Sequence, residues 1–187
     1  MSGKTVLLKT IALSQYLFQF GFYIPAKQAI IIPVEEVAVS IGDHHSEVNG
    51  LSSFADEILK INQIIHKVRK GKKLLVLIDE LARTTNPEEG KALVSAFIRI
   101  MSEHKVMSLI TTHYSGILSP TRKLRVKGLK TDQITENITP KTLNDYMDYS
   151  LVETQTDDVP MEALKIAEIF EVDAEFLNLA KTMMKHS

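Results

Sequence analysis

The residues best suited to chemistry near the start of the chain are Gly3, Lys4 and Thr5, which open an apolar-periodic segment. Glycine, lysine and threonine in this order end a phosphate-binding loop when a helix follows directly, because backbone N–H groups at the helix start face phosphate oxygens. The lysine then neutralises phosphate charge and the threonine hydroxyl binds Mg²⁺. We therefore predict Lys4 and Thr5 as ligands of phosphate and Mg²⁺, with Ser2 and Gly3 in the same loop, although three residues can also match by chance.

A pair of carboxylates, Asp79 and Glu80, follows the apolar run at 74–78. Such a run is typical of a buried strand, and open parallel sheets bind ligands at the carboxyl ends of their strands. In ATPases with a phosphate-binding loop, the first carboxylate supports Mg²⁺ and the second polarises the water that attacks the γ-phosphate. We predict these roles for Asp79 and Glu80; the alternative is a solvated acidic pair at a strand end.

The third candidate is His113, which with Thr112 follows a second predicted buried strand at 106–111. An imidazole in this place can hydrogen-bond a γ-phosphate or orient the attacking water. The alternative is a surface or core histidine with a local partner. Because the residue follows a strand end as the acidic pair does, we predict the first role.

The elements that must position these residues alternate between helix and strand. Periodicity and turn residues predict a helix at 4–20, two short strands with a turn at 29–41, a helix capped by Ser52 or Ser53 and running to about residue 69, a strand at 74–78, a helix from 87 to near 104, a strand at 106–111, a strand or hairpin at 123–137, and two short helices at 160–170 and 174–185. This alternation indicates βαβ units. The predicted fold class is α/β, with a mainly parallel sheet flanked by helices.

Composition limits the classes of protein that this chain can be. Its 187 residues include 44% hydrophobic and 24% charged residues, no cysteine, and a net charge of -1. These values are ordinary for a globular domain, give no basic footprint for autonomous nucleic-acid binding, and exclude disulfides and thiolate metal sites. The apolar stretch at 6–22 is interrupted by polar residues such as Lys9 and Gln15, so we predict no membrane anchor and expect a cytoplasmic protein.

The order of these motifs resembles the ATPase domain of MutS-type proteins, which are ABC-type P-loop ATPases. The matching segments are Gly3-Lys4-Thr5, Phe22 to Ala26, Ser52-Ser53-Phe54 with Glu57, Asp79-Glu80 with Arg83 and Gly90, Thr111 to Tyr114, Tyr149 to Leu151, and Val159-Pro160. The resemblance covers nearly the whole chain and implies ATP and Mg²⁺ as ligands. We place the ATPase domain at 1–152 and a C-terminal helical appendage at 153–187.

The resemblance further implies a composite site in a homodimer, or with a MutS-like partner subunit. The loop with Ser52 and Ser53 of one subunit would close over the γ-phosphate held by Lys4 of the other, so ATP would favour association. The function implied is ATP-dependent dimer closure that controls binding of mismatched DNA, in mismatch repair, by domains outside this chain.

Two departures from the family pattern leave alternatives open. The family's loop begins with a glycine several residues before Gly3 and follows a central strand, so we expect an ATPase domain truncated within its Walker A loop. The segment from Leu81 to Gly90 is poorer in glycine, serine and threonine than that of mismatch-repair members. The alternatives are a MutS-like ATPase that reactivates a cobalamin-dependent lysine aminomutase, and a catalytically inactive interaction fragment.

Overall fold

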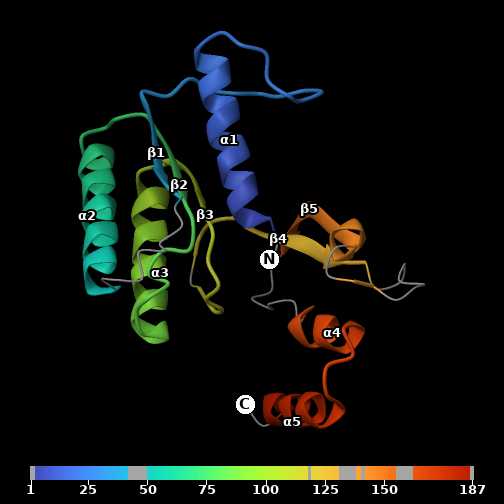
Figure 1. The fold of residues 1–187 in the computed structure, drawn as a ribbon. Helices are drawn as coiled ribbons and strands as arrows, with labels where there is room; N and C mark the ends of the chain where they lie inside the picture. Colours follow the sequence, from blue (N-terminus) through green and yellow to red (C-terminus); the bar gives the residue numbers. More distant parts are fainter. Residues whose placement is uncertain are drawn as a thin grey trace. The chain divides into compact units, whose positions relative to one another are not determined.

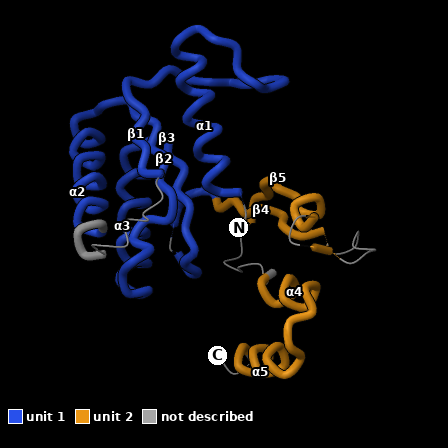
Figure 2. Tube along the Cα trace, viewed as in Figure 1, with its two compact units in different colours: residues 1, 3–122 blue, residues 2, 123–187 orange. Residues whose placement is uncertain are grey.

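The computed structural model describes residues 3–41, 50–117, 119–130, 138–139, 142–154 and 162–185. In chain order the elements are α1 (Lys4–Gln19), β1 (Glu36–Ser40), α2 (Gly50–Arg69), β2 (Leu74–Ile78), α3 (Pro87–Glu103), β3 (Met107–Ile110), β4 (Lys123–Leu129), the 3₁₀ helix η2 (Leu143–Tyr146), β5 (Met147–Thr154), α4 (Glu162–Ile169) and α5 (Ala174–Lys185) (Figure 1). They form two compact units, divided after Arg122, which Figure 2 distinguishes by colour.

The first unit is built on a parallel sheet with strand order β1-β2-β3. In its register Glu36 lies beside Leu74, and Leu75 lies beside Met107. Every residue of β2 is buried, because this strand has a neighbour on each edge and helices over each face. The arrangement confirms the predicted α/β class with a parallel sheet.

Helices cover both faces of this sheet (Figure 1). Alternate side chains of β2 point to opposite faces. Leu74, Val76 and Ile78 join a cluster with α2 and α3, whereas Leu75 and Leu77 join a second cluster with α1. Helix α1 therefore packs on the face opposite α2 and α3.

Local chemistry explains where α1 and α3 begin and end. Asn86 caps α3, since its side-chain oxygen accepts from the Glu88 N–H at 2.9 Å, and Pro87 occupies the first helical position. Helix α1 ends just before Gly21, whose φ of 77° suits glycine. Both helices match the predicted segments to within one residue at each end.

The prediction of two strands at 29–41 is wrong, because only β1 forms there. The backbone before it bonds to side chains of α1 instead of to a strand. Gln15 Nε2 donates to the Ile32 carbonyl at 3.0 Å, and Gln19 Nε2 donates to the Val34 carbonyl at 3.1 Å. Pro33, between them, has no N–H to offer a neighbouring strand.

The prediction of a helix cap at Ser52 or Ser53 is also wrong. Helix α2 begins at Gly50, so the backbone of both serines lies inside its first turn. Serine is tolerated there because the first N–H groups of any helix lack intrahelical partners.

The second unit contains an antiparallel pair and two short helices. Strands β4 and β5 pair with Lys123 beside Thr154, and the register shifts between Val126 and Gly128. This confirms a strand at the start of the predicted 123–137 segment, whose residues 131–137 lie outside the described ones. Helices α4 and α5 confirm the two predicted C-terminal helices and are joined by an ion pair between Glu168 and Lys181.

The predicted division between an ATPase domain at 1–152 and an appendage at 153–187 stays a prediction. Across the described part of the chain, no helix is long and apolar enough to cross a membrane.

Candidate functional site

The candidate site lies where the chain leaves the carboxyl ends of β2 and β3. Asp79 directly follows β2, and Thr111 directly follows β3. Backbone bonds continue past the strands, since Asp79 N–H donates to the Ser40 carbonyl and Thr111 N–H donates to the Ile78 carbonyl, each at 2.9 Å. Both loops are thereby held at the edge of the sheet where parallel sheets bind ligands.

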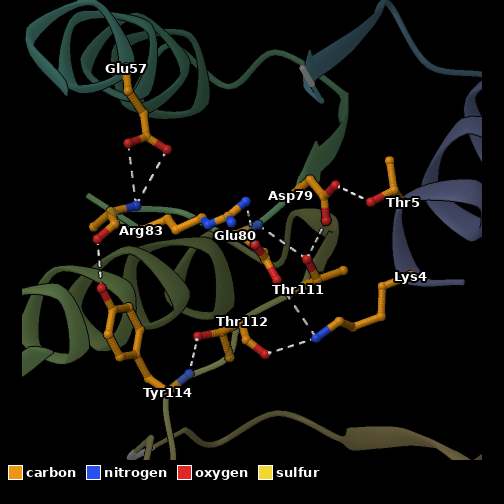
Figure 3. Close-up of polar contacts among 10 residues, drawn as sticks. Lys4, Thr5, Glu57, Asp79, Glu80, Arg83, Thr111, Thr112 and Tyr114 are labelled. Carbon is orange, nitrogen blue, oxygen red and sulfur yellow. Dashed lines mark hydrogen bonds and ion pairs between the residues drawn. The ribbon is translucent and has the colours of Figure 1, made fainter. Parts of the chain in front are cut away.

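Asp79 accepts hydrogen bonds from two hydroxyls that come from different elements (Figure 3). Thr5 Oγ1, in the first turn of α1, donates to Asp79 Oδ2 at 2.5 Å, and Thr111 Oγ1 donates to Asp79 Oδ1 at 2.6 Å. The aspartate therefore ties the start of α1 to both strand ends.

Thr5 and Asp79 fit a magnesium ion. Mg²⁺ takes one or two protein oxygens and completes its octahedron with water and phosphate oxygens. A hydroxyl and a carboxylate already in contact can share such an ion without a dedicated cage. The described residues contain no group of three or more histidine, aspartate or glutamate side chains that could hold a metal alone.

Glu80 lies between two cationic side chains. Lys4 Nζ is 3.9 Å from Glu80 Oε1, and Arg83 Nη1 is 3.4 Å from Glu80 Oε2. Lys4 Nζ also donates to the Thr112 carbonyl at 3.5 Å. All three charged side chains are partly exposed, so these pairs are weak. An anion with several charges can therefore replace Glu80 as the partner of Lys4 at little cost.

The start of α1 is suited to an anion. Gly3 precedes the helix with φ 67°, a left-handed conformation that favours glycine, and it makes no side-chain cap. The first turn carries no acidic residue, so nothing on the helix itself competes with a ligand for the positive end of its dipole. Lys4 and Thr5 occupy the first two helical positions.

The loop after β2 has an unusual backbone. Glu80 and Ala82 have φ values of 52° and 60°, which residues other than glycine rarely adopt. Two side chains labelled in Figure 3, those of Glu57 and Tyr114, bind Ala82: its N–H donates to both oxygens of Glu57 at 3.3 Å, and its carbonyl accepts from Tyr114 Oη at 2.6 Å. Burial, and secondarily the charge of Glu57, raise the pKa of Tyr114.

The structure brings four of the predicted site residues together: Lys4, Thr5, Asp79 and Glu80. It places the His113 side chain in the open, with its ring 4.1 Å from that of Tyr114 between centroids. The role of His113 at a γ-phosphate stays a prediction.

Gly3 lies directly before α1, whereas three other predicted ligands cannot be placed. Ser2 lies outside the described residues, and so do the side chains of Ser52 and Ser53. Sequence reasoning missed the part of Thr111, which donates to Asp79 and accepts from the Glu80 N–H at 3.1 Å. The sequence signal for this role was a hydroxyl residue directly after a strand, β3, that neighbours the strand before the acidic pair.

Comparison with known proteins finds one family, by a family model and by individual relatives. A family model described as MutS domain V matches residues 1–186. The chain is 37% identical over 117 residues to a protein named Endonuclease MutS2 of Thermus thermophilus, which covers 63% of this chain and 16% of that protein. It is 34% identical over 150 residues to the Endonuclease MutS2 of Lactobacillus helveticus, covering 80% of this chain and 17% of the relative. The chain thus spans a small part of each relative's length.

Proposed function

The chain belongs to the MutS domain V family, the C-terminal ATPase region of MutS-type proteins, and we propose that it binds and hydrolyses ATP with Mg²⁺ as an ABC-type ATPase module. The observation that carries the proposal is the meeting of Thr5, Asp79 and Thr111 beside the pair Lys4 and Glu80. Two segments far apart in sequence there supply the cation, the hydroxyl and the two carboxylates that phosphoryl transfer uses, and a third segment, with Thr111, holds Asp79.

Each side chain has a step that follows from its position. Lys4 leaves Glu80 and binds the β- and γ-phosphates, which carry more charge than one carboxylate. Thr5 and Asp79 would hold Mg²⁺, which would neutralise phosphate charge. Glu80, released from Lys4, accepts a hydrogen bond from water and takes its proton as the oxygen attacks the γ-phosphorus. The bond from the γ-phosphorus to the bridging oxygen breaks, and that oxygen leaves as part of ADP.

Coupling to a partner is the finer part of the proposal. We propose that ATP draws two such modules together, with the segment around Ser52 and Ser53 of one closing on the γ-phosphate held by the other. A contact made to a γ-phosphate is lost with ADP, so the nucleotide state biases association. The support is the family pattern together with the partial exposure of Lys4 and Glu80, which leaves their site open to a partner.

We propose that the full protein acts on DNA, of the mismatch-repair type, through regions outside this chain. The relatives carry the word endonuclease in their names, and the net charge of -1 leaves DNA contact to other parts. A MutS-like ATPase that reactivates a lysine aminomutase is the second candidate, favoured by the Thr84-Thr85-Asn86-Pro87 segment after the acidic pair.

The experiment measures ATP hydrolysis by the chain, and by a form joined to the preceding region of the Thermus relative. Glu80→Gln keeps the shape of the side chain but cannot take a proton. We expect it to lower kcat by about 100-fold or more while binding of ATP is retained. Glu103→Gln is the matched control, because Glu103 pairs with Arg99 at the far end of α3.

The outcomes separate the claims. Hydrolysis that Glu80→Gln stops and Glu103→Gln leaves intact supports the proposal. If neither form binds or hydrolyses ATP, the enzyme assignment falls and the family fold alone remains.

A further inference from the structure

The loop after β2 is strained at Glu80, whose carboxylate the proposed function uses. Glu80 and Ala82 both adopt left-handed backbone angles, with φ values of 52° and 60°. A side chain makes this conformation unfavourable, so it persists only where surrounding contacts enforce it.

Burial is the first constraint on the loop after β2. The side chains of Leu81 and Ala82 are 2% and 0% exposed and belong to the apolar cluster under α2 and α3. The chain thus turns into the core directly after Glu80, while the Glu80 carboxylate stays partly exposed. Leaving the left-handed conformation would pull one of these side chains out of the core or move the carboxylate.

Hydrogen bonds to Ala82 are the second constraint on this loop. The Glu57 side chain is 6% exposed, and both its oxygens accept from the Ala82 N–H. Tyr114 Oη donates to the Ala82 carbonyl at 2.6 Å. Both backbone groups of one strained residue are therefore bound by side chains from α2 and from the segment after β3. The loop's own bond, from the Thr85 N–H to the Ala82 carbonyl at 3.3 Å, is therefore supplemented from two other elements.

Gly90 completes the arrangement. It is buried in the first turn of α3, and a Cβ atom built there would lie 2.2 Å from Tyr114 Oη and 2.5 Å from its Cζ. Those distances are far shorter than any van der Waals contact. A side chain at this position would collide with the tyrosine ring where it reaches Ala82.

We propose that Glu57, Tyr114 and Gly90 form a loop clamp that sets the direction of the Glu80 carboxylate. The inference rests on the proposed function, since it assigns positioning residues to the same reaction. The clamp binds Ala82, two positions after Glu80. On the other side, the carbonyl and the hydroxyl oxygen of Thr111 both accept from the Glu80 N–H. With both sides held, the carboxylate lies beside Lys4 at the start of α1 before any ligand arrives, which is the preorganisation that an attacking water requires.

Two readouts test the loop clamp. The first is amide hydrogen exchange at Glu80 and Ala82 in the nucleotide-free chain, followed by NMR. Tyr114→Phe removes a bond to the Ala82 carbonyl and none to either N–H group, so their exchange rises only if the loop itself relaxes. We expect it to rise by about tenfold. The second readout is kcat against KM for ATP, in the form that hydrolyses ATP.

We expect Tyr114→Phe and Gly90→Ala each to lower kcat by about tenfold with KM changed less than about twofold, because binding groups stay and only the carboxylate is misdirected. The double variant should lose little more than either single one, since both act on one contact. Glu57→Gln, which keeps an acceptor for Ala82, should retain more kcat than Glu57→Ala. Tyr149→Phe is the matched control, as it loses a hydroxyl bond to Asn144 within the other unit.

Unchanged exchange in Tyr114→Phe overturns the loop clamp whether or not the protein hydrolyses ATP. Raised exchange with unchanged kcat, or a lowered melting temperature alone, overturns its positioning role. A wild-type protein without ATPase activity defeats the proposed function instead, and the exchange readout still decides whether the clamp holds the loop.

Discussion

Replacement of Thr111 by valine tests whether one hydroxyl joins the two strand ends of the site. Thr111 is 8% exposed, donates to Asp79 Oδ1 at 2.6 Å and accepts from the Glu80 N–H at 3.1 Å. Valine has nearly the same shape and packs equally well, so the substitution removes the two polar contacts with little change in apolar packing. The loss of stability then measures those contacts.

The magnitude follows from the kind of each bond. A hydrogen bond to a charged group contributes about 1.5–3 kcal/mol. The Glu80 N–H keeps the Thr111 carbonyl at 3.2 Å as a second acceptor, so its lost bond adds only about 0.5 kcal/mol, and water reaches the half-buried Asp79 and offsets part of the total. We expect Thr111→Val to lower the free energy of unfolding by about 2 kcal/mol.

Urea denaturation followed by circular dichroism measures this change. With a slope of about 2 kcal/mol per molar urea, the midpoint should fall by about 1 M. Thr111→Ser is the control: it keeps the hydroxyl and loses one methyl group, worth about 0.8 kcal/mol when buried. If Thr111→Val proves as stable as Thr111→Ser, the hydroxyl does not hold the strand ends together and the reasoning is refuted.

Two further predictions concern other parts of the chain. Gln15 is only 4% exposed, and Gln15→Leu leaves the Ile32 carbonyl without its side-chain donor at 3.0 Å. We expect this substitution to lower the free energy of unfolding by about 1–2 kcal/mol, and the control Gln28→Leu, at an exposed position, to change it by less than about 0.5 kcal/mol. Equal midpoints of urea denaturation for the two variants would contradict this. Hydrogen bonds from the Ser150 side chain and backbone lower the pKa of Asp148 below its usual 3.8, so its contribution to stability is complete above that pH and is lost as the pH falls through the lower folded value. Asp148→Asn should remove this acid dependence, measured as melting temperature between about pH 2 and pH 5, and an unaltered pH profile would speak against it.

Local patterns were sufficient to predict the α/β fold class and the places of four candidate site residues at a strand end and a helix start. The apolar run at 74–78 had to be a buried strand, because five consecutive apolar residues need cover on both faces. Asp79 and Glu80 directly follow this run in the chain, so a strand at 74–78 places them at its carboxyl end. Lys4 and Thr5 were at a helix start for the same reason. Each of these inferences needs only the residues within one turn or one strand.

Tertiary structure decided everything that depends on a partner far along the chain. Gln15 and Gln19 bind the backbone near Pro33 in place of a second strand. The beginning of α2 at Gly50 puts Ser52 and Ser53 inside a helix.

The same holds for the groups around the acidic pair. Thr111 lies 32 residues from Asp79, and Glu57 and Tyr114 lie 25 and 32 residues from the loop residue they hold. Sequence periodicity indicates which face of a strand or helix is apolar, but not which polar side chain meets which backbone group across two packed elements. Those pairings form only when α1, α2 and α3 pack on the sheet, because packing alone brings the donors and acceptors within hydrogen-bond distance.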